Sequence, residues 1–548
     1  MRRSVACLLA CCGIAIAIAS ADAEPKAAAA ATPAQVGHGA TAIPIHDGTL
    51  EISLNEAVNL AIERSLDVEL IRFDPEIAEK NLGAAWGAYD PQLYGEGGYS
   101  SVETPTASQI IGITLLTQET SQGEAGLRGQ IPWLGGSYQV GYEGSELITN
   151  SRISVLSPEF RAGYLATLQI PLLRGLFWSE SWTLVRLSRI GVDLSNDQFR
   201  GRLMDIVRNT EDAYWGLQAA QDGERVAQKS LETAQALLEQ TQAQYEVGVV
   251  SRVEVVQAEA GVADREFRLI RAAAIARNTQ DTLVDLVLGP YLEPETEMRV
   301  VATDPSGEIT VREVSAAAAT EHAMARLPEL AVARKNIERR KVEVAAASND
   351  RLPQLDVVGT YGKSGLSGRT NPDCLDFTAA TPCTSPPRLR TDFVDADRNL
   401  FDSTGAQSYS IAGVLSIPLG NNAARNLHDR ARLELRRSET AYNRLEQSII
   451  SDIRRAARNL RAAVEGIEAA ERGEVAAAEQ LRAERVRLEF GESTPFDVLQ
   501  REDDLVTAQG QKILAQQTYH NSISELDRVQ GTILDRHQIA VEEAATLR

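Results

Sequence analysis

The chain has 548 residues, of which 76 are acidic and 55 are Lys or Arg, so its formal net charge at pH 7 is −21. A chain this acidic repels the phosphate backbone of nucleic acids, and no nucleic-acid partner is expected. Aromatic residues make up only 5% of the chain, which argues against a large conventional globular core.

The N-terminus carries the pattern of an export signal. Arg2 and Arg3 precede an apolar stretch from Val5 to Ala19, and small residues suited to cleavage follow. This pattern predicts a signal peptide over residues 1–23. Leu9-Ala10-Cys11 loosely resembles a lipoprotein box, so lipidation stays open. Residues 24–50 are rich in Ala, Pro and Gly and are expected to be a flexible N-terminal segment.

The remainder of the chain repeats one plan twice. Each copy begins with a helical stretch that opens on a capping pattern, continues into alternating strand-like segments, and ends in a long helical hairpin. Repeat 1 is predicted over 51–290, with helices 51–89, strands 91–172 and hairpin 181–289. Repeat 2 is predicted over 309–535, with helices 310–351, strands 353–419 and hairpin 421–535. A linker, 291–308, joins the repeats, and a tail, 536–548, follows them.

The strand-like segments alternate apolar and polar residues, as in Phe160 to Ile170 and in Tyr409 to Ile417. Such strands have one apolar and one polar face, and the sequence supplies no obvious layer to cover the apolar one. Beyond the signal, no apolar run approaches the ~20 residues of a membrane-spanning helix, so any membrane insertion is expected to use strands. We count four strand candidates in the first copy and two in the second, and whether four or six enter a barrel stays open. Neither number closes a barrel alone, since about eight strands are needed, so an oligomer is expected.

Two very long helices are predicted over 181–248 and 421–490, where no proline interrupts a helix-forming composition. Each would be about 100 Å long at ~1.5 Å per residue. Apolar or small residues recur at alternating three and four spacings, which is typical of coiled coils. The expected stripes are Leu231, Ala234, Leu238, Thr241 and Tyr245, then Val253, Val256, Ala260, Ala263, Phe267, Ile270 and Ala274 on the return, and Ile467, Ala470, Glu474, Ala477, Leu481, Glu484 and Leu488 in the second copy.

Cys374 and Cys383 are the only cysteines beyond the predicted signal, and they lie in an irregular loop, 363–408, that is expected on the outside. In an oxidising compartment a local disulfide is the favoured interpretation. A zinc site is the alternative, but no histidine lies near and zinc requires about four ligands.

The sequence contains no catalytic constellation, so an enzyme is not expected and no cofactor or metal is predicted. The six histidines are scattered, and no phosphate-binding loop or nucleophile elbow occurs. Functional residues are expected instead at the two helical turns around Gly248 and Gly491. Glycine there ends the long helix, and Glu254 or Asp497 suits the start of the next one. For these acids a simple capping role competes with a functional role.

The ordered set of motifs resembles the TolC family of outer-membrane efflux proteins over essentially the whole mature chain. The set comprises the capped helix, Pro-Gln-Leu at 91–93 and 353–355, the strands, Ile-Pro-Leu at 170–172 and 417–419, the long helix, and a glycine turn before Glu254-Val255-Val256-Gln257 or Asp497-Val498-Leu499-Gln500. The resemblance implies a mainly helical fold with strands, in which two tandem repeats supply antiparallel coiled-coil helices to a trimeric periplasmic α-barrel and strands to a shared transmembrane β-barrel.

The resemblance also implies the site and the partners. Asp497 matches the family's ring aspartate at the periplasmic mouth, whereas Gln500 stands where the best-known member has a second acid. Glu254 and Arg252 complete the expected gate, and Glu492, Asp503 and Asp504 are expected to add negative field nearby. The expected contacts with a periplasmic adaptor (membrane fusion protein) are Val247, Gly248, Val249, Phe490, Gly491 and Glu492. The expected surroundings are a homotrimer in the lipid of a Gram-negative outer membrane, with an inner-membrane transporter of RND, ABC or MFS type.

The implied function is that of a passive exit duct for small molecules such as drugs and toxic compounds. A type I secretion conduit for proteins is the alternative within the family, because the tunnel is shared. An alternative from another class is a periplasmic coiled-coil adaptor or structural protein, which would carry one hairpin flanked by soluble β domains and would not repeat the complete unit.

Overall fold

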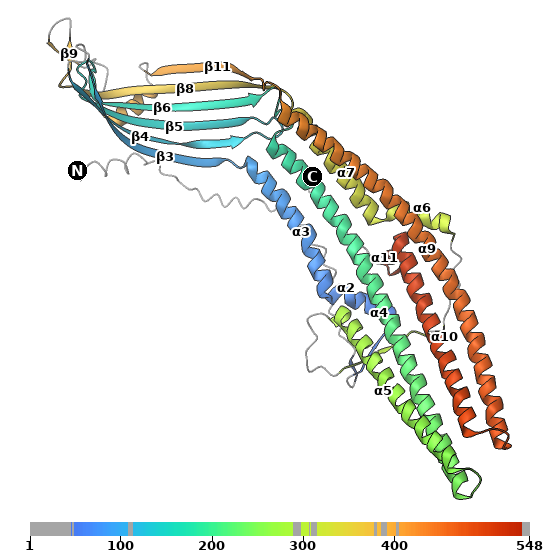
Figure 1. Ribbon diagram of the computed structural model, residues 1–548. Coiled ribbons are helices and arrows are strands. Elements are labelled where there is room, and N and C mark those ends of the chain that lie inside the picture. The colour runs from blue at the N-terminus through green and yellow to red at the C-terminus, as the bar shows by residue number, and fades with distance from the viewer. Residues whose placement is uncertain are drawn as a thin grey trace. The chain divides into compact units, whose positions relative to one another are not determined.

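The computed structural model describes residues 45–46, 49–107, 113–288, 298–305, 307, 315–376, 381–384, 392–401 and 405–539 (Figure 1). The predicted signal peptide, nearly all of the N-terminal segment, the helix start at Thr310 and the end of the tail lie outside these residues. Contacts divide the chain into two compact units. Unit 1 comprises residues 1–73, 198–328 and 447–548, and unit 2 comprises 74–197 and 329–446. Each unit is therefore built from both repeats.

Unit 2 contains a six-stranded antiparallel sheet in the order β11-β8-β6-β5-β4-β3 (Figure 1). Repeat 1 supplies four strands and repeat 2 supplies two, so the hairpin whose place was open belongs to the sheet. Within the described residues, β3 and β11 each pair on one side only. The strands are β3 (Gln92–Pro105), β4 (Leu115–Gln130), β5 (Ser137–Thr149), β6 (Leu156–Pro171), β8 (Gln354–Thr370) and β11 (Ala406–Ser416).

The two faces of this sheet differ in chemistry near the base of the strands. One register row runs across all six strands through Leu93, Leu127, Val140, Ala166, Tyr361 and Tyr409. The adjacent row, on the opposite face, runs through Gln92, Arg128, Gln139, Thr167, Thr360 and Ser410. We call these the apolar face and the polar face. Because side chains alternate across a strand, the two rows give this part of the sheet one apolar and one polar face.

The base of the sheet is surrounded by tryptophans. Four of the five tryptophans of the chain gather there, and we call Trp86, Trp133, Trp178 and Trp182 the tryptophan cluster. The ring centroids of Trp86 and Trp133 lie 5.7 Å and 6.3 Å from that of Trp182. The Arg186 guanidinium lies 4.3 Å from the centroid of Trp178. Trp133 remains 57% exposed although it is the largest type of apolar side chain.

The loop opposite the base contains the disulfide and a short helix. Cys374 and Cys383 are bonded, beside the two-residue strands β9 (Leu375–Asp376) and β10 (Thr381–Pro382), so the zinc alternative is wrong. Helix α8 (Phe393–Phe401) packs on the apolar face, where Ala396 and Leu400 are fully buried with Ala162. The expectation that nothing covers this face is therefore wrong for the part beneath α8.

Helices complete unit 2. Helix α3 (Leu66–Trp86) and the 3-10 turn η1 (Gly87–Tyr89) lead into β3, whereas α7 (Pro328–Asn349) leads into β8. Ion pairs join α7 to the beginnings of two long helices, α4 (Glu180–Glu246) and α9 (Asn422–Glu489). Lys335 Nζ lies 2.8 Å from Asp193 of α4, and Arg340 Nη1 lies 2.9 Å from Glu434 of α9. Across the described residues, each helix is too short or too polar to span a bilayer.

Unit 1 is organised around a small sheet and helix α2 (Leu54–Arg64). The capping box expected at Ser53 and Glu56 is confirmed. Strand β2 (Thr49–Ile52) pairs antiparallel with β1 (Ile45–His46) and parallel with β7 (Arg299–Ala302), which lies inside the segment expected to be a linker. The sheet contributes Leu50, Ile52 and Val300 to a buried core, which also contains Tyr214 of α4 and Leu283 of the helix 252–288. The sheet therefore connects the entry of repeat 1 with the passage between the repeats.

The remaining helices of unit 1 are α5 (Arg252–Leu288), α6 (Ala316–Arg326), α10 (Pro495–Gln530) and α11 (Ile533–Arg536). The apolar stripe expected in the second copy is confirmed by the burial of Ile467, Ala477 and Leu481. In the first copy Leu231, Ala234 and Thr241 are buried, but Leu237 is buried in place of Leu238, and Tyr245 is exposed.

The stripe predicted on the return helix α5 is wrong. Val255, Ala258 and Arg265 are the buried residues of its first half, whereas Val253, Val256, Phe267 and Ile270 are between 48% and 67% exposed. The physical reason is that α5 turns the face of Arg265 toward α10, to which Arg265 is hydrogen bonded. The predicted apolar stripe exists in the sequence but faces away from the rest of its own chain.

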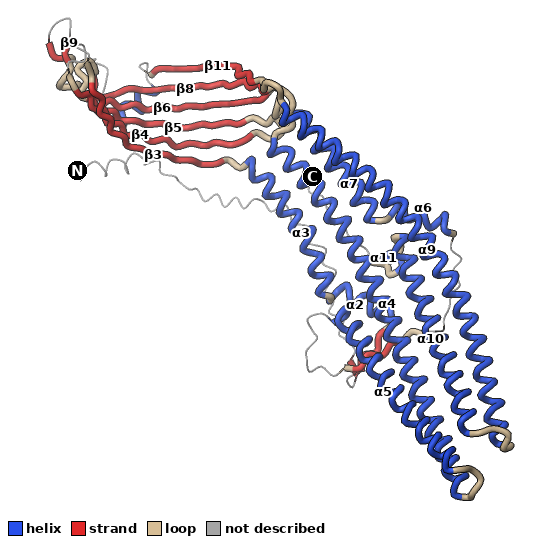
Figure 2. The backbone as a smooth tube through the Cα atoms, viewed as in Figure 1, coloured by secondary structure: helices blue, strands red, loops and turns tan. Residues whose placement is uncertain are grey.

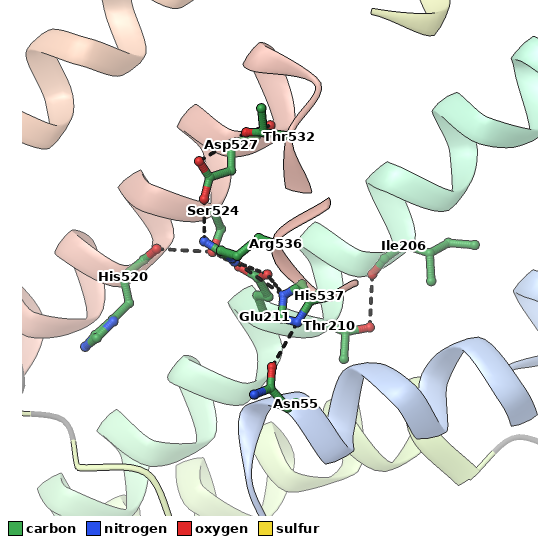
Figure 3. A network of polar contacts seen from close by, with 10 residues as sticks. All are labelled: Asn55, Ile206, Thr210, Glu211, His520, Ser524, Asp527, Thr532, Arg536 and His537. Atoms are coloured by element: carbon green, nitrogen blue, oxygen red, sulfur yellow. Dashed lines mark hydrogen bonds and ion pairs between the residues drawn. The ribbon is translucent and has the colours of Figure 1, made fainter. Parts of the chain in front are cut away.

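A buried ionic network fixes the C-terminal residues onto helix α4 (Figure 3). Glu211 of α4 is completely buried, and its carboxylate accepts hydrogen bonds from Ser524 of α10 and from Arg536 of α11. The Nε2 atom of His537 lies 2.5 Å from the same carboxylate. The other ring nitrogen of His537 lies 3.0 Å from Asn55 Oδ1 of α2. Glu211 thus joins the first helix of repeat 1 to the last helices of repeat 2.

The network contains enough positive charge to keep Glu211 ionised. Burial opposes ionisation, but His537, Arg536 and Ser524 together hold the pKa of Glu211 below its ordinary value. Arg536 also donates to Asp527, 2.6 Å away, so its own charge is balanced on two sides. A buried charge with complete hydrogen bonding specifies one arrangement of the helices, because any other leaves it without partners.

We predict that Glu211→Ala destabilises unit 1 by about 3 kcal/mol, because it leaves the buried Ser524 hydroxyl and the partly exposed Arg536 guanidinium without this acceptor. The thermal midpoint, measured by circular dichroism in detergent, should fall. Glu479→Ala is the control, because the Glu479–Arg482 pair is exposed and should contribute little. Equal midpoints for Glu211→Ala and the wild type would remove the network as a structural determinant.

The depressed pKa of Glu211 also predicts a pH dependence. A carboxyl whose pKa is lowered by folding stabilises the folded state fully above its unfolded pKa, ordinarily 4.5 here, and this contribution is lost as the pH falls through the folded value. The thermal midpoint of the wild type should therefore fall between pH 5 and pH 3 more steeply than that of Glu211→Gln, which has no charge to lose. Parallel pH profiles for the two proteins would contradict this assignment.

Candidate functional site: the helix-hairpin tips

The two turns that join α4 to α5 and α9 to α10 have the same backbone geometry. Gly248 and Gly491 have φ values of +84° and +74°, a region that favours glycine. In both turns the residue after the glycine donates its backbone N–H to a backbone oxygen in the last turn of the helix. Val249 donates to Gln244 and Glu492 donates to Arg487, and both N···O distances are 2.9 Å. This is the Schellman pattern of a helix C-terminus. Both turns lie at the same end of the helices of unit 1 (Figure 2).

At the start of each return helix a hydroxyl side chain is hydrogen bonded to an acid three positions later. Thr494 and Asp497 form a reciprocal capping box, in which Asp497 Oδ2 accepts from the Thr494 backbone N–H at 3.2 Å and from its hydroxyl at 2.7 Å. These bonds from Thr494 lower the pKa of Asp497, so the side chain is negatively charged at neutral pH. In the other turn Ser251 Oγ lies 3.3 Å from Glu254 Oε1. Asp497 therefore caps α10, Glu254 only accepts from the Ser251 hydroxyl, and the charge of Asp497 lies near the surface.

The tips expose large apolar side chains that nothing in the described chain covers. Val247 is 75% exposed, Val249 is 72% exposed and Phe490 is 78% exposed. Val253 and Phe496, one turn into the return helices, are 64% and 52% exposed. Clustered exposure of this kind marks an interaction surface. We call Val247, Val249, Phe490 and Phe496 the tip patch.

The remaining residues of the expected gate are distributed along the starts of α5 and α10. Arg252 and Gln500 are exposed, and Glu254 is partly buried. The acids expected to add negative field are largely balanced: Asp503 lies 2.9 Å from Arg265, and Asp504 lies 2.8 Å from Arg501. The negative field expected from Asp503 and Asp504 stays a prediction, and in the described chain both acids have an arginine partner.

The two hairpins are joined just above the tips by a buried arginine. Arg265 of α5 is 3% exposed, and its Nη2 atom donates to the backbone oxygen of Leu499 at 3.1 Å and to Asp503 Oδ1 at 2.9 Å, both on α10. Gly261 allows this approach, because a Cβ atom there would lie 2.9 Å from the Leu499 side chain. We call Arg265, Leu499 and Asp503 the arginine latch.

An apolar contact and a buried acid surround the latch. Leu499 and Val498 of α10 pack with Ala234 and Leu237 of α4 and with Leu481 of α9, so all four long helices meet here. Glu502 is 4% exposed, and burial raises its pKa, although Arg265 and Arg485 act in the opposite direction. The latch therefore holds the first hairpin to the second with directional bonds inside a small core.

Sequence reasoning did not identify the latch. The signal was present, because Val255, Ala258, Val262 and Arg265 follow the three and four spacing of one helix face, which places an arginine where an apolar residue is expected. The acidic run Glu502-Asp503-Asp504 offers the partner. An arginine in an otherwise apolar stripe is stable only with such a partner.

These observations define a class of protein. Two tandem repeats supply one two-faced antiparallel sheet and two long helical hairpins with matched, exposed tips, which is the architecture of an outer-membrane channel protein rather than of an enzyme. A family model described as outer membrane efflux protein matches residues 129–287 and 319–532, more than half of the chain. The chain belongs to the outer membrane efflux protein family. The resemblance to the TolC family is thereby confirmed, and a channel of this family performs no catalysis.

Individual relatives agree with this assignment. The chain is 29% identical over 216 residues to the alkaline protease secretion protein AprF of Pseudomonas aeruginosa, a match that covers 38% of this chain and 42% of that relative. The CmeC outer membrane channel of Campylobacter jejuni superposes with a TM-score of 0.60 at 17% identity, covering 90% of each chain. The outer membrane protein VceC of Vibrio cholerae gives a TM-score of 0.60 at 15% identity, covering 87% of this chain and 96% of that one. These structures establish the fold.

For the arginine latch we predict that Arg265→Ala raises backbone hydrogen exchange in residues 495–505 by about tenfold or more, since a hydrogen bond to a charged group is worth about 1.5–3 kcal/mol. Arg268→Ala is the matched control, because Arg268 also contacts Asp503, at 3.3 Å, but is 46% exposed. Its substitution should change exchange much less. If the two variants exchange alike, the buried position of Arg265 has no special role.

Proposed function

We propose that the chain is the outer-membrane exit duct of a tripartite export system and works as a homotrimer in the outer membrane of a Gram-negative bacterium. Its helical part stands in the periplasm, where it meets an adaptor and, through it, an inner-membrane transporter. The observation that carries this proposal is the sheet of unit 2, whose apolar and polar faces match the outside and the lumen of a membrane barrel.

The sheet requires further copies of the chain in order to close. Within a bilayer every backbone N–H and C=O must be paired, so the outer edges of β3 and β11 need a partner. Pairing β3 of one copy with β11 of the next closes a ring. Three copies of six strands make a barrel of 18 strands, an even number within the range of bacterial outer-membrane barrels.

The helices support the same assembly. The exposed stripe of Val253, Val256, Phe267 and Ile270 on α5 is apolar and has the spacing of a helix-packing surface. A neighbouring copy is the natural cover for it, because a helical wall requires each hairpin to pack on two sides. This assigns the predicted coiled-coil stripe of α5 to a contact between copies.

The tips supply a mouth and a docking surface in this assembly. Three copies of Asp497 would form a ring of negative charge, and the pKa of Asp497 is already lowered by its cap. The tip patch, with Gly248, Gly491 and Glu492, would receive the adaptor. Arg252, Glu254 and Gln500 lie at the starts of the return helices and would adjust the charge of the mouth. Opening would be a population shift between two packings of the hairpins, with the arginine latch favouring one of them.

The cargo is proposed in two forms. A duct for small molecules such as drugs and toxic compounds agrees with the efflux family model. Secretion of a protein is the second candidate, and it is favoured by the match to a relative whose name describes alkaline protease secretion. The adaptor alternative is excluded, because the chain repeats the complete unit and belongs to the channel family.

Asp497 offers a test that separates charge from capping. Asp497→Asn keeps an oxygen that can accept from Thr494 but removes the charge, whereas Asp497→Ala removes both and also breaks the capping box. We predict that both variants weaken block of the channel by multivalent cations in planar bilayers, and that Gln500→Glu strengthens it. Unchanged block in Asp497→Asn would reduce Asp497 to a capping residue.

The tip patch offers a test of docking. Combined Val247→Asp and Phe490→Asp should abolish export in a complemented deletion strain, since each places a charge in an apolar contact, while the heat-modifiable trimer persists in detergent. Val475→Asp is the control, because Val475 is 70% exposed on α9 outside the tip. Drug susceptibility and protease secretion, measured side by side, also show which cargo is carried. Full export by the double variant would refute docking at the tip patch.

A further inference from the structure

Helix α8 lies on the apolar face of the sheet, in a loop to which no role has yet been assigned. Gly365 and Gly144 permit the contact, because a side chain at Gly365 would meet the Ala396 carbonyl and one at Gly144 would meet the ring of Phe393. Asn399 donates to the backbone oxygen of Leu366 at 2.9 Å. The helix is partly hidden behind the strands in Figure 2. It is therefore a fitted part of unit 2 and not a loosely attached loop.

The outward surface of α8 is divided between apolar and charged residues. Val394 and Phe401, seven positions apart and so on one flank of the helix, are 58% and 72% exposed. Between them lies Arg398, whose side chain is 64% exposed and pairs with Asp395 at 3.5 Å. Arg398 therefore lies on the same flank as the two apolar residues, where its long side chain can keep its stem among apolar groups and its charge in water, as at a lipid–water boundary.

The apolar flank points along the sheet toward its apolar rows. Phe401 lies 6.2 Å from the ring of Tyr164, and the Lys363 ammonium lies 5.5 Å from the centre of the Phe401 ring. At the other end of the helix, Asp392 pairs with Arg369 near the end of β8. Aromatic rings with a lysine beside them are typical of membrane boundaries.

The height of α8 above the base of the sheet agrees with the thickness of a membrane. Lys363 is nine residues beyond Gln354, the first residue of β8, which is about 30 Å along the strand at ~3.3 Å per residue. With a strand tilt of 35–45° the height is about 23 Å, close to the apolar band of about 25 Å in outer-membrane barrels. The tryptophan cluster lies at the base, so aromatic residues mark both borders of the band.

Neighbouring copies would not cover α8. The helix packs on β6 and β8, which are paired on both sides within the chain, whereas copies of the chain would join at β3 and β11. The surface beside Val394 and Phe401 is continuous with the exposed apolar face, where Ile411 is 82% exposed. Because the apolar face is proposed to meet lipid, the surface beside Val394 and Phe401 is expected to meet lipid as well.

We propose that α8 is a collar at the outer lipid–water boundary, with Val394 and Phe401 among the acyl chains and the Arg398 guanidinium among the headgroups. The proposal rests on the proposed function, because it requires the apolar face to meet lipid. The collar would set how far the barrel rises above the membrane, since the strands continue beyond the apolar band.

The test is the accessibility of single spin labels in the reconstituted full-length channel. Cysteines placed at Val394, Phe401, Arg398 and Ile411 are labelled without reductant, so that the Cys374–Cys383 bond stays closed, and the protein is inserted into vesicles of phosphatidylcholine and phosphatidylglycerol. All four side chains are largely exposed, so labelling requires no repacking. We expect the labels at 394, 398 and 401, which share one flank of α8, to collide more with oxygen than with a water-soluble nickel chelate.

The label at Ile411 distinguishes failure of the collar from failure of the membrane barrel. If it is in lipid while the labels at 394 and 401 meet only the nickel chelate, the collar is overturned and the membrane barrel stands. If Ile411 itself meets the chelate, the apolar face does not meet lipid and the proposed function fails. Labels at 394 and 401 that lie as deep as Ile411 would also overturn the collar, because they would place α8 inside the hydrocarbon rather than at its border.

Discussion

The backbone N–H and C=O groups at the two edges of the six-stranded sheet must find partners, and this requirement determines how the protein assembles. One chain supplies strands that pair with each other but leaves one side of β3 and one side of β11 open. In water such edges are a liability, and in lipid they are prohibitive. Under the proposed function the apolar face of the strands meets lipid, and the assembly of several copies then follows from the chemistry of one sheet.

In the helical unit, buried charges fix how the elements pack, whereas in the sheet the alternation of apolar and polar residues does so. Glu211 gathers α2, α4, α10 and α11 at one point, and Arg265 gathers the two hairpins near their tips. Both are single charges inside small cores, and both are hydrogen bonded to backbone or side-chain partners on other helices. Long helices packed through alanine can slide along one another, and a buried ion pair opposes such sliding because it has only one register with all partners in place. The hairpin tips lie beyond both buried charges, so they are the parts of the hairpins that these charges do not hold in register.

The fold was largely readable from the sequence because its signals are periodic and repeated. Alternation in six segments predicted the strands, and uninterrupted helix-forming runs predicted α4 and α9 almost to the residue. The face of α5 was mispredicted because its most regular apolar stripe serves a surface that the chain itself leaves open. Helix α8 was missed because a nine-residue helix in a Pro- and Asp-rich loop has too few turns to establish a period. The buried roles of Glu211 and His537 depend on partners more than 300 residues away, which no local pattern shows.

The most direct test of the account is disulfide cross-linking between copies in intact outer membranes. Ser100 of β3 and Ser408, Ser410 and Ala412 of β11 lie on the polar face, so Ser100→Cys is combined with a cysteine at each of the three. Oxidation should give a ladder ending in a trimer for at least one combination, whereas Ser101→Cys, on the opposite face, should give much less with the same partners. Absence of cross-linking in every combination, in a protein that still reaches the outer membrane, would contradict closure of the barrel through β3 and β11.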